Sequence, residues 1–197
     1  YMEITEDDHG TYIMNSRDLR AIEHVGELVK IGVDCLKIEG RTKSHYYTAR
    51  TSQLYRRAID DALAGRPFNP ELSVELEGLA NRGYTDGFFV RRQIKAQQNY
   101  ATGSSNSATQ QFVGEVLDYD PASGLATVAV KNQFKRGDSL EVIDPRGNWL
   151  TRVADLRDAA SDEPLEVAKG SGWVVKVAVG EVGPLSLLAR NLPGAAG

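Results

Sequence analysis

The stretch that decides the fold, residues 32–65, reads GVDCLKIEGRTKSHYYTARTSQLYRRAIDDALAG. It opens with a compact apolar run at residues 33–38, which predicts a β-strand. A polar turn ends this run, and Thr42 or Ser44 can then cap a helix. We expect that helix to continue to Ala64, because a glycine and a proline follow it.

A second strand and helix precede this stretch. Residues 11–14 form a short β-prone run, and apolar residues recur at helical spacing over residues 17–31. Short connections in the order strand, helix, strand, helix are typical of a parallel sheet covered by helices. We therefore expect residues 33–38 to be buried on both faces. Two such strands cannot close a barrel, which needs about eight, so the chain reads as the C-terminal part of a longer protein.

The remaining sequence divides into a connector and an all-β domain. Residues 67–110 contain a short helix that begins near Pro70, a turn-rich segment at 81–87 and a small, polar linker at 97–110. Residues 111–197 contain alternating, turn-bounded runs that predict six strands, at 112–119, 125–130, 139–143, 149–153, 172–179 and 185–189. Six short strands in so few residues favour a small antiparallel β-barrel.

Composition excludes several classes of protein. The 197 residues carry a formal net charge of −4, which excludes a globally basic nucleic-acid binder but not a local basic patch. The single cysteine excludes a disulfide framework and a zinc site built from several thiolates. No apolar run approaches the roughly 20 residues of a membrane helix. No secretory leader is evident, so we expect a cytoplasmic protein without a membrane partner.

The densest group of ionisable residues follows the predicted strand, in the segment LKIEGRTK at residues 36–43. Ligands of parallel α/β folds bind at the carboxyl ends of strands. Glu39 can accept a proton, and Arg41 can hold a carboxylate or a phosphate. Lys37 shares a face with Glu39 on a strand. A structural ion pair among these residues explains the pattern equally well.

A second candidate is the basic stretch at residues 41–57, which contains no acidic residue. Cations and aromatic or amide side chains form one stripe of the helix, made of Lys43, Tyr46, Arg50, Gln53 and Arg57. Such a stripe suits contact with RNA phosphates and bases. The alternative is a solvated face whose arginines pair with acids such as Asp34 or Asp61.

Other residues carry weaker signals. Asn15 lies in a turn before the first helix, and Arg82, Tyr84 and Thr85 lie in the turn-rich segment, where they can line a site or simply pack. Cys35 falls inside the predicted strand, so we expect an inert thiol of the core. The sequence shows no spacing for a Ser/His/Asp triad, a metal site or a phosphate-binding loop.

Three segments together resemble a known family. HGTYIMNSRDLRAI, the stretch at residues 32–65 and LANRGYTDGFF are similar to the C-terminal part of peptidase family U32, and QQFVGEV, VAVKNQF and GDSLEVIDPRGN resemble the β-barrel domain that follows it. The resemblance implies that residues 1–66 are the last βα units of a TIM-like barrel, that 67–110 connect and that 111–197 form an accessory β-barrel. The similarity is greatest to a branch that hydroxylates the wobble uridine of tRNA at carbon 5, although the family is often described as collagenase-like peptidases.

The same resemblance implies roles for individual residues. Glu39 and Arg41 would lie at the catalytic mouth, and the substrate-binding set would be Lys37, Lys43, Asn15, Arg82, Tyr84 and Thr85. Prephenate is the implied co-substrate and tRNA the implied partner, docked through the β-barrel. The implied iron–sulfur cluster would be held upstream, since Cys35 cannot supply about four thiolates and arginine stands at position 20. A tRNA-modifying enzyme, a U32-type peptidase and a non-catalytic RNA-binding module remain the three alternatives, and we expect the chain alone to be inactive.

Overall fold

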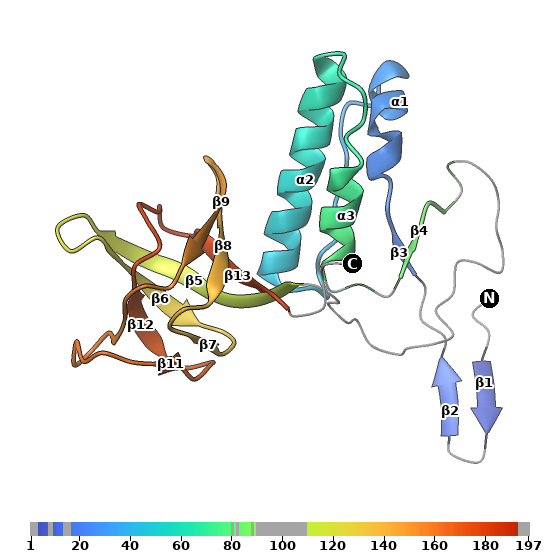
Figure 1. Cartoon of the computed structure of the whole chain (residues 1–197). Coiled ribbons are helices and arrows are strands. Elements are labelled where there is room, and N and C mark those ends of the chain that lie inside the picture. The colour runs from blue at the N-terminus through green and yellow to red at the C-terminus, as the bar shows by residue number, and fades with distance from the viewer. Residues whose placement is uncertain are drawn as a thin grey trace. The chain divides into compact units, whose positions relative to one another are not determined.

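The chain, seen here as a computed structural model (Figure 1), divides into two compact units, Tyr1–Ala108 and Thr109–Gly197. The structure describes residues 4–7, 10–13, 17–79, 81, 83–87, 89 and 110–192. Each unit has its own architecture: the first is mainly helical, and the described part of the second is built from strands. The predicted linker at 97–110 lies outside the described residues except for Gln110.

The described residues of the first unit form three α-helices that lie side by side in Figure 1: α1 (Val25–Lys30), α2 (His45–Leu63) and α3 (Glu71–Glu77). The helix predicted up to Ala64 is confirmed as α2, and Ser44 is its N-cap, since Ser44 Oγ accepts a hydrogen bond from the Tyr47 amide at 3.2 Å. The helix predicted near Pro70 is confirmed as α3.

The core of the first unit joins the facing sides of these helices. Its fully buried side chains come from every helix and from the short 3₁₀ turn η1 (Ile22–His24), and they are Ile22, Val25, Leu54, Ala58, Leu72, Leu76 and Leu79. Leu54 and Ala58 are four residues apart, so they share one face of α2. This apolar face holds α1 and α3 against α2.

The helix predicted over residues 17–31 is wrong in its first half. Residues there form the short strand β3 (Asp18–Leu19), which pairs in parallel with β4 (Tyr84–Thr85), and helix begins only at η1. Backbone bonds to a partner distant in sequence decide the outcome, since the Asp18 amide donates to Gly83 O at 2.9 Å. Nearer the N-terminus, the strand predicted at 11–14 is confirmed over residues 11–13, inside the hairpin of β1 (Ile4–Asp7) and β2 (Gly10–Ile13).

The strand predicted at residues 33–38 is also wrong in this structure. The segment runs without regular secondary structure, and Cys35 is exposed instead of buried in a core. A strand requires a neighbour that exchanges ladder hydrogen bonds with it, and no described residue pairs with this segment as a strand. The expected parallel sheet is therefore reduced, in the described residues, to the single pair β3–β4.

The second unit is built on a seven-stranded antiparallel sheet with the order β10-β12-β6-β5-β13-β8-β9. Its strands are β5 (Gln110–Asp120), β6 (Leu125–Val130), β8 (Ser139–Asp144), β9 (Gly147–Arg152), β10 (Leu156–Asp158), β12 (Val174–Val177) and β13 (Leu187–Asn191). A two-stranded sheet pairs β7 (Phe134–Lys135) with β11 (Val167–Ala168). All six predicted strands are confirmed within a few residues at their ends, and β7, β10 and β11 were not predicted. The sheet ends at β10 and β9, so closure into a barrel is not confirmed.

Two features stabilise the second unit. On β6, the buried residues Ala126 and Val128 alternate with half-buried ones, and Gly114 on β5 lies so close that an added Cβ would meet a Val128 methyl at 2.5 Å. The carboxylate of Asp144 is 1% exposed and accepts hydrogen bonds from Arg146 and from Ser186 Oγ at 2.8 Å. The Arg146 guanidinium, followed by the Arg146 amide and the Ser186 hydroxyl, holds the pKa of Asp144 well below its usual range.

Candidate functional site

The first unit contains a cavity of about 390 Å³, a size typical of small-molecule sites. Its walls come from residues 17–21 around β3, Leu28 of α1, residues 35–39 after α1, Thr42 and Lys43 just before α2, the first half of α2, and Leu76, Tyr84 and Phe89. The predicted site residues Lys37, Glu39, Lys43 and Tyr84 all line it. The structure thus brings together residues of two segments that are about 40 positions apart in the sequence, LKIEGRTK at 36–43 and the turn-rich segment at 81–87.

One wall of the cavity is a stripe of α2 that the sequence analysis missed. Tyr47, Thr51 and Tyr55 line the cavity and are spaced four residues apart, so they lie on one face of the helix. Tyr55 Oη accepts a hydrogen bond from the Ala21 amide at 2.8 Å, and burial raises the pKa of Tyr55. Thr51 is 5% exposed, and its hydroxyl has no hydrogen-bond partner among the described residues. A polar ligand in the cavity can satisfy that hydroxyl.

Lys43 is held at the cavity by a buried ion pair. Its Nζ lies 2.7 Å from Asp18 Oδ2, and the side chains are 11% and 8% exposed. The same ammonium lies over the ring of Tyr47, 5.0 Å from its centroid. Asp18 is anchored in turn by the β3–β4 pairing, so the strand, the helix start and the charged pair form one connected wall.

Tyr84 contributes an ordered phenol to the cavity wall, beside Asp18 in the β3–β4 pair. Its hydroxyl donates to Leu76 O at 3.0 Å, and the guanidinium of Arg20 lies 5.2 Å from its ring centroid. Burial, followed by the nearby Tyr47 and Asp18, raises the pKa of Tyr84 well above its usual value. The phenol is therefore protonated at neutral pH and acts as a hydrogen-bond donor and a packing surface, not as a base.

Positive charge exceeds negative charge around the cavity. The lining includes four cations, Arg17, Arg20, Lys37 and Lys43, and the two acids Asp18 and Glu39. Arg20 is paired with Glu23 and Glu77 at 2.9 Å each. Arg17 and Lys37 have no carboxylate partner within the part of the chain that the structure describes. The cavity therefore suits a small anion.

The two predicted catalytic residues occupy an exposed turn. Glu39 Oε1 accepts a hydrogen bond from the Arg41 amide at 2.9 Å, which closes the turn between the irregular segment and α2. The Arg41 side chain is exposed and is not among the residues that line the cavity. Thr85 likewise has a local role, because its Oγ1 accepts from the Gly87 amide at 3.1 Å. The predicted site residues Asn15 and Arg82 lie outside the described residues.

The predicted RNA-binding stripe is largely paired within the first unit, although Arg57 remains exposed. Arg50 has a side chain that is 2% exposed, and its guanidinium lies 2.6 Å from Glu75 of α3 and 2.6 Å from Gln53. Arg57 also reaches Glu75, at 3.1 Å. Tyr46 is 6% exposed, and Lys43 is held by Asp18. Glu75 of α3 thus supplies counter-charge to both arginines, which lowers the positive charge that this side of α2 can offer to RNA.

The residues present do not fit an iron–sulfur cluster or a zinc centre. Cys35 is the only cysteine of the sequence, whereas such clusters take about four thiolates. Among the described residues no group of three or more His, Cys, Asp and Glu side chains is placed to hold a metal ion. His24 stacks on Phe89 with ring centroids 5.3 Å apart.

No described helix is both long and apolar enough to cross a membrane.

Comparison with protein families and with individual proteins identifies relatives of both units. The profile of peptidase family U32 matches residues 1–99, and that of the peptidase family U32 C-terminal domain matches residues 108–189. The chain is 53% identical to tRNA hydroxylation protein P of Escherichia coli over 98% of its own length and 43% of that protein's. The corresponding Haemophilus influenzae protein is 49% identical over 97% of the chain and 42% of its own length.

More distant similarities carry other names. A collagenase of Porphyromonas gingivalis is 26% identical over 77% of the chain. A crystal structure of the C-terminal domain of a U32 peptidase from Geobacillus thermoleovorans is 32% identical, with a TM-score of 0.38, and covers 41% of this chain and 98% of that one. The chain spans about two fifths of the length of the two tRNA hydroxylation proteins.

Proposed function

The chain belongs to peptidase family U32, and from that membership we propose that it is the C-terminal part of a protein that hydroxylates tRNA. The observation that carries the proposal is the 53% identity to tRNA hydroxylation protein P over nearly the whole chain, which includes both units. The collagenase name belongs to a relative of half that identity. A cysteine or serine peptidase needs a base, usually a histidine, beside its nucleophile. Among the described residues, no histidine lines the cavity beside Cys35.

We propose that the reaction is hydroxylation of the wobble uridine at carbon 5 and that the cavity of the first unit binds a small carboxylic acid, prephenate. The unpaired cations Arg17 and Lys37 supply charge for a carboxylate. The buried hydroxyl of Thr51, which has no hydrogen-bond partner among the described residues, supplies a polar contact. The iron–sulfur cluster of such a protein belongs to a part outside this chain, since Cys35 is the only thiol here.

We further propose that residues 33–38 become a central strand of a TIM-like barrel when the rest of the protein is present, and that the second unit closes into a small barrel. The apolar run of residues 33–38 and its lack of a strand partner in the described residues support the first part. Cys35 tests it. A maleimide should label this thiol within minutes in the 197-residue chain and slowly in the longer protein, whereas equally fast labelling in both would contradict the barrel.

The reaction is tested in cells that lack the gene for the longer protein. Mass spectrometry of tRNA nucleosides should show loss of 5-hydroxylated wobble uridine, and the intact gene should restore it. Unchanged nucleosides in the deletion strain would contradict the proposed function. Cleavage of gelatin by the purified longer protein, abolished in a cavity variant, would instead favour the peptidase.

The ligand of the cavity is tested by calorimetry with prephenate and the longer protein. R17Q and K37Q should each weaken binding about tenfold, since an exposed charge-assisted contact contributes about 1.5 kcal/mol. K30Q is the matched control, because Lys30 is exposed on α1 and pairs with Glu27 away from the cavity. Equal affinities for all four proteins would show that the acid does not bind here.

A further inference from the structure

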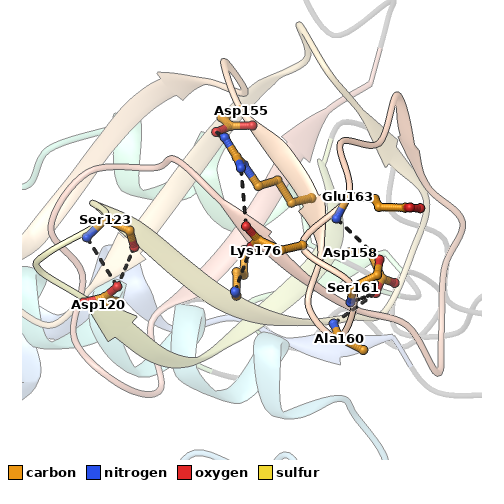
Figure 2. A network of polar contacts seen from close by, with 10 residues as sticks. Asp120, Ser123, Asp155, Asp158, Ala160, Ser161, Glu163 and Lys176 are labelled. Carbon is orange, nitrogen blue, oxygen red and sulfur yellow. Dashed lines mark hydrogen bonds and ion pairs between the residues drawn. The ribbon is translucent and has the colours of Figure 1, made fainter.

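The cations of the second unit fall into two groups that differ in their partners. Lys176 Nζ lies 2.8 Å from Asp162, and Arg157 lies 2.9 Å from Asp155. Figure 2 shows Lys176 and Asp155 in this network of polar contacts. These cations are neutralised by acids of their own unit. Lys135, Arg152 and Lys169 form the other group, and none of them has a carboxylate partner among the described residues 110–192.

The second group is gathered on one surface by contacts of the backbone. Lys135 lies opposite Val167 in the β7–β11 pair, so the two side chains share a face, and the exposed Lys169 follows directly where β11 ends at Ala168. Lys135 is exposed while its neighbour Phe134 is buried, which fixes that face as the outer one. Arg152 joins them, because its Nε donates to Gly137 O at 3.0 Å, in the turn that follows β7.

Arg136 extends this surface, and the nearby carboxylates of Glu166 and Asp138 neutralise little of its charge. Its Nε donates to Ala154 O at 3.0 Å, which leaves only a loose contact of 3.7 Å to Glu166. Asp138 is turned inward, where its carboxylate accepts from the Lys135 amide and from Arg190. We call the exposed set Lys135, Arg136, Arg152 and Lys169 the β7–β11 basic surface.

The two arginines are held in place before any partner binds. The Nε–H of each arginine donates a hydrogen bond to a backbone carbonyl, Arg136 to Ala154 and Arg152 to Gly137. These bonds restrict the positions of the two guanidinium groups. Such pre-organisation lowers the entropy lost on binding, and the planar fork suits phosphate oxygens. An aromatic ring is also present, since Lys169 lies 5.4 Å from the ring centroid of Trp173. Cations with aromatic neighbours are typical of nucleic-acid surfaces.

We propose that the β7–β11 basic surface is the part of this chain that docks tRNA, through the phosphate backbone. This inference rests on the proposed function, which supplies tRNA as the substrate. It assigns the phosphate contact to four cations of the second unit that the sequence analysis did not single out. Phosphate contacts position an RNA without reading its sequence. The surface therefore holds the tRNA while another part of the protein selects the uridine.

The test measures binding of fluorescently labelled tRNA by anisotropy at several salt concentrations. The triple variant K135Q/R152Q/K169Q removes three unpaired cations, and K30Q/R157Q/K176Q is its matched control, since it removes two lysines and one arginine that are already paired. Each phosphate contact contributes a slope near 0.7–0.9 in log Kd against log salt. We expect the test variant to bind on the order of 100-fold more weakly at 0.1 M salt, with a slope lower by about 2, and the control to bind like wild type.

Three results would overturn the inference. Wild-type affinity in a test variant whose circular dichroism and tryptophan fluorescence are native would remove the surface from the contact. Equal losses in both triple variants would mean that only net charge matters. Absence of tRNA binding by the wild-type chain, with binding to anionic phosphatidylglycerol vesicles instead, would assign the surface to lipid. None of these results depends on the nucleoside measurement, so failure of the docking surface and failure of the proposed reaction are distinguishable.

Discussion

Replacing Glu75 by glutamine should destabilise the first unit more than replacing Arg50 by methionine. Arg50 has a side chain that is 2% exposed, and its main counter-charge lies 2.6 Å away on Glu75. Removing one partner of a buried ion pair typically costs 3–5 kcal/mol, because the remaining charge is left without compensation. Glu75 is 26% exposed, so water partly reaches the pair, and we expect about 2–3 kcal/mol for E75Q.

R50M should cost only about 1 kcal/mol. Methionine fills much of the arginine's volume with apolar atoms, and the carboxylate left behind keeps Arg57 at 3.1 Å and some water. The double variant R50M/E75Q should resemble R50M, because it contains no buried cation that the loss of the carboxylate could leave unpaired. The expected coupling free energy between the two substitutions is about 2–3 kcal/mol, the whole cost of E75Q alone.

Urea unfolding can assign the loss to one unit. The helices α1, α2 and α3 all lie in the first unit, so circular dichroism at the helix minimum reports it. Both tryptophans, Trp149 and Trp173, lie in the second unit, and their fluorescence should not change with either substitution. A cost for E75Q equal to or below that of R50M would refute the reasoning. So would native stability of R50M together with weakened tRNA binding, which would restore Arg50 as an RNA contact.

Three further predictions concern single sites. D144N should lower the stability of the second unit by about 2 kcal/mol at pH 7. Because folding lowers the pKa of Asp144, the stability that its carboxylate contributes is complete above about pH 4 and disappears as the pH falls toward the lowered pKa. Unfolding detected by tryptophan fluorescence should therefore depend less on pH in D144N than in the wild type. G114A should cost about 1–3 kcal/mol by overpacking against β6, whereas G26A, with open space around its Cβ, should stabilise α1 by up to about 1 kcal/mol, and the reverse order would contradict the packing described. D18N should destabilise the first unit by about 2–4 kcal/mol in helix-detected unfolding, since it leaves the ammonium of Lys43 buried beside a neutral side chain; no loss would show that the pair is solvated.

Elements fixed by local signals could be predicted from the sequence, and those fixed by a partner could not. The helix α2 carries its own cap at Ser44 and its own stop at Gly65, whose φ of 69° suits glycine. The long strands of the second unit carry alternating apolar residues and turn signals. The strands β3, β4, β7, β10 and β11 have only two or three residues each, and a backbone partner far along the chain creates each of them.

Residues 33–38 show the same limit from the other side. Their apolar pattern matches a buried strand, but a pattern states only what a segment can pair with, not whether a neighbour is present. In the described residues no strand pairs with it, so the segment stays irregular and Cys35 stays exposed. The error in the sequence analysis and the proposal of a larger barrel therefore share one cause.

The part of the cavity wall that α2 forms was not predicted, because the sequence analysis assigned function to another face of that helix. The predicted stripe through Arg50 and the observed cavity stripe of Tyr47, Thr51 and Tyr55 are offset by one residue along α2. Because an α-helix turns by about 100° per residue, the two stripes lie about 100° apart around the helix axis. Hydropathy could not separate them, because both stripes mix aromatic and polar side chains. The spacing Tyr-x-x-x-Thr-x-x-x-Tyr was a usable signal, since three hydrogen-bonding side chains at intervals of four residues share one face.

The density of cations along the sequence was a poor guide to where an anionic partner binds. The basic stretch at 41–57 is the richest in the chain, yet Glu75, Asp18 and Asp60 neutralise much of it in the folded first unit. Lys135, Arg152 and Lys169 are scattered over about 35 residues and form no motif, but folding gathers them and leaves them without acids among the described residues. Attraction for phosphate depends on the charge that remains after internal pairing. For this chain that criterion favours named residues of the second unit, the unit through which the resemblance already implied tRNA docking, over the basic stretch of α2.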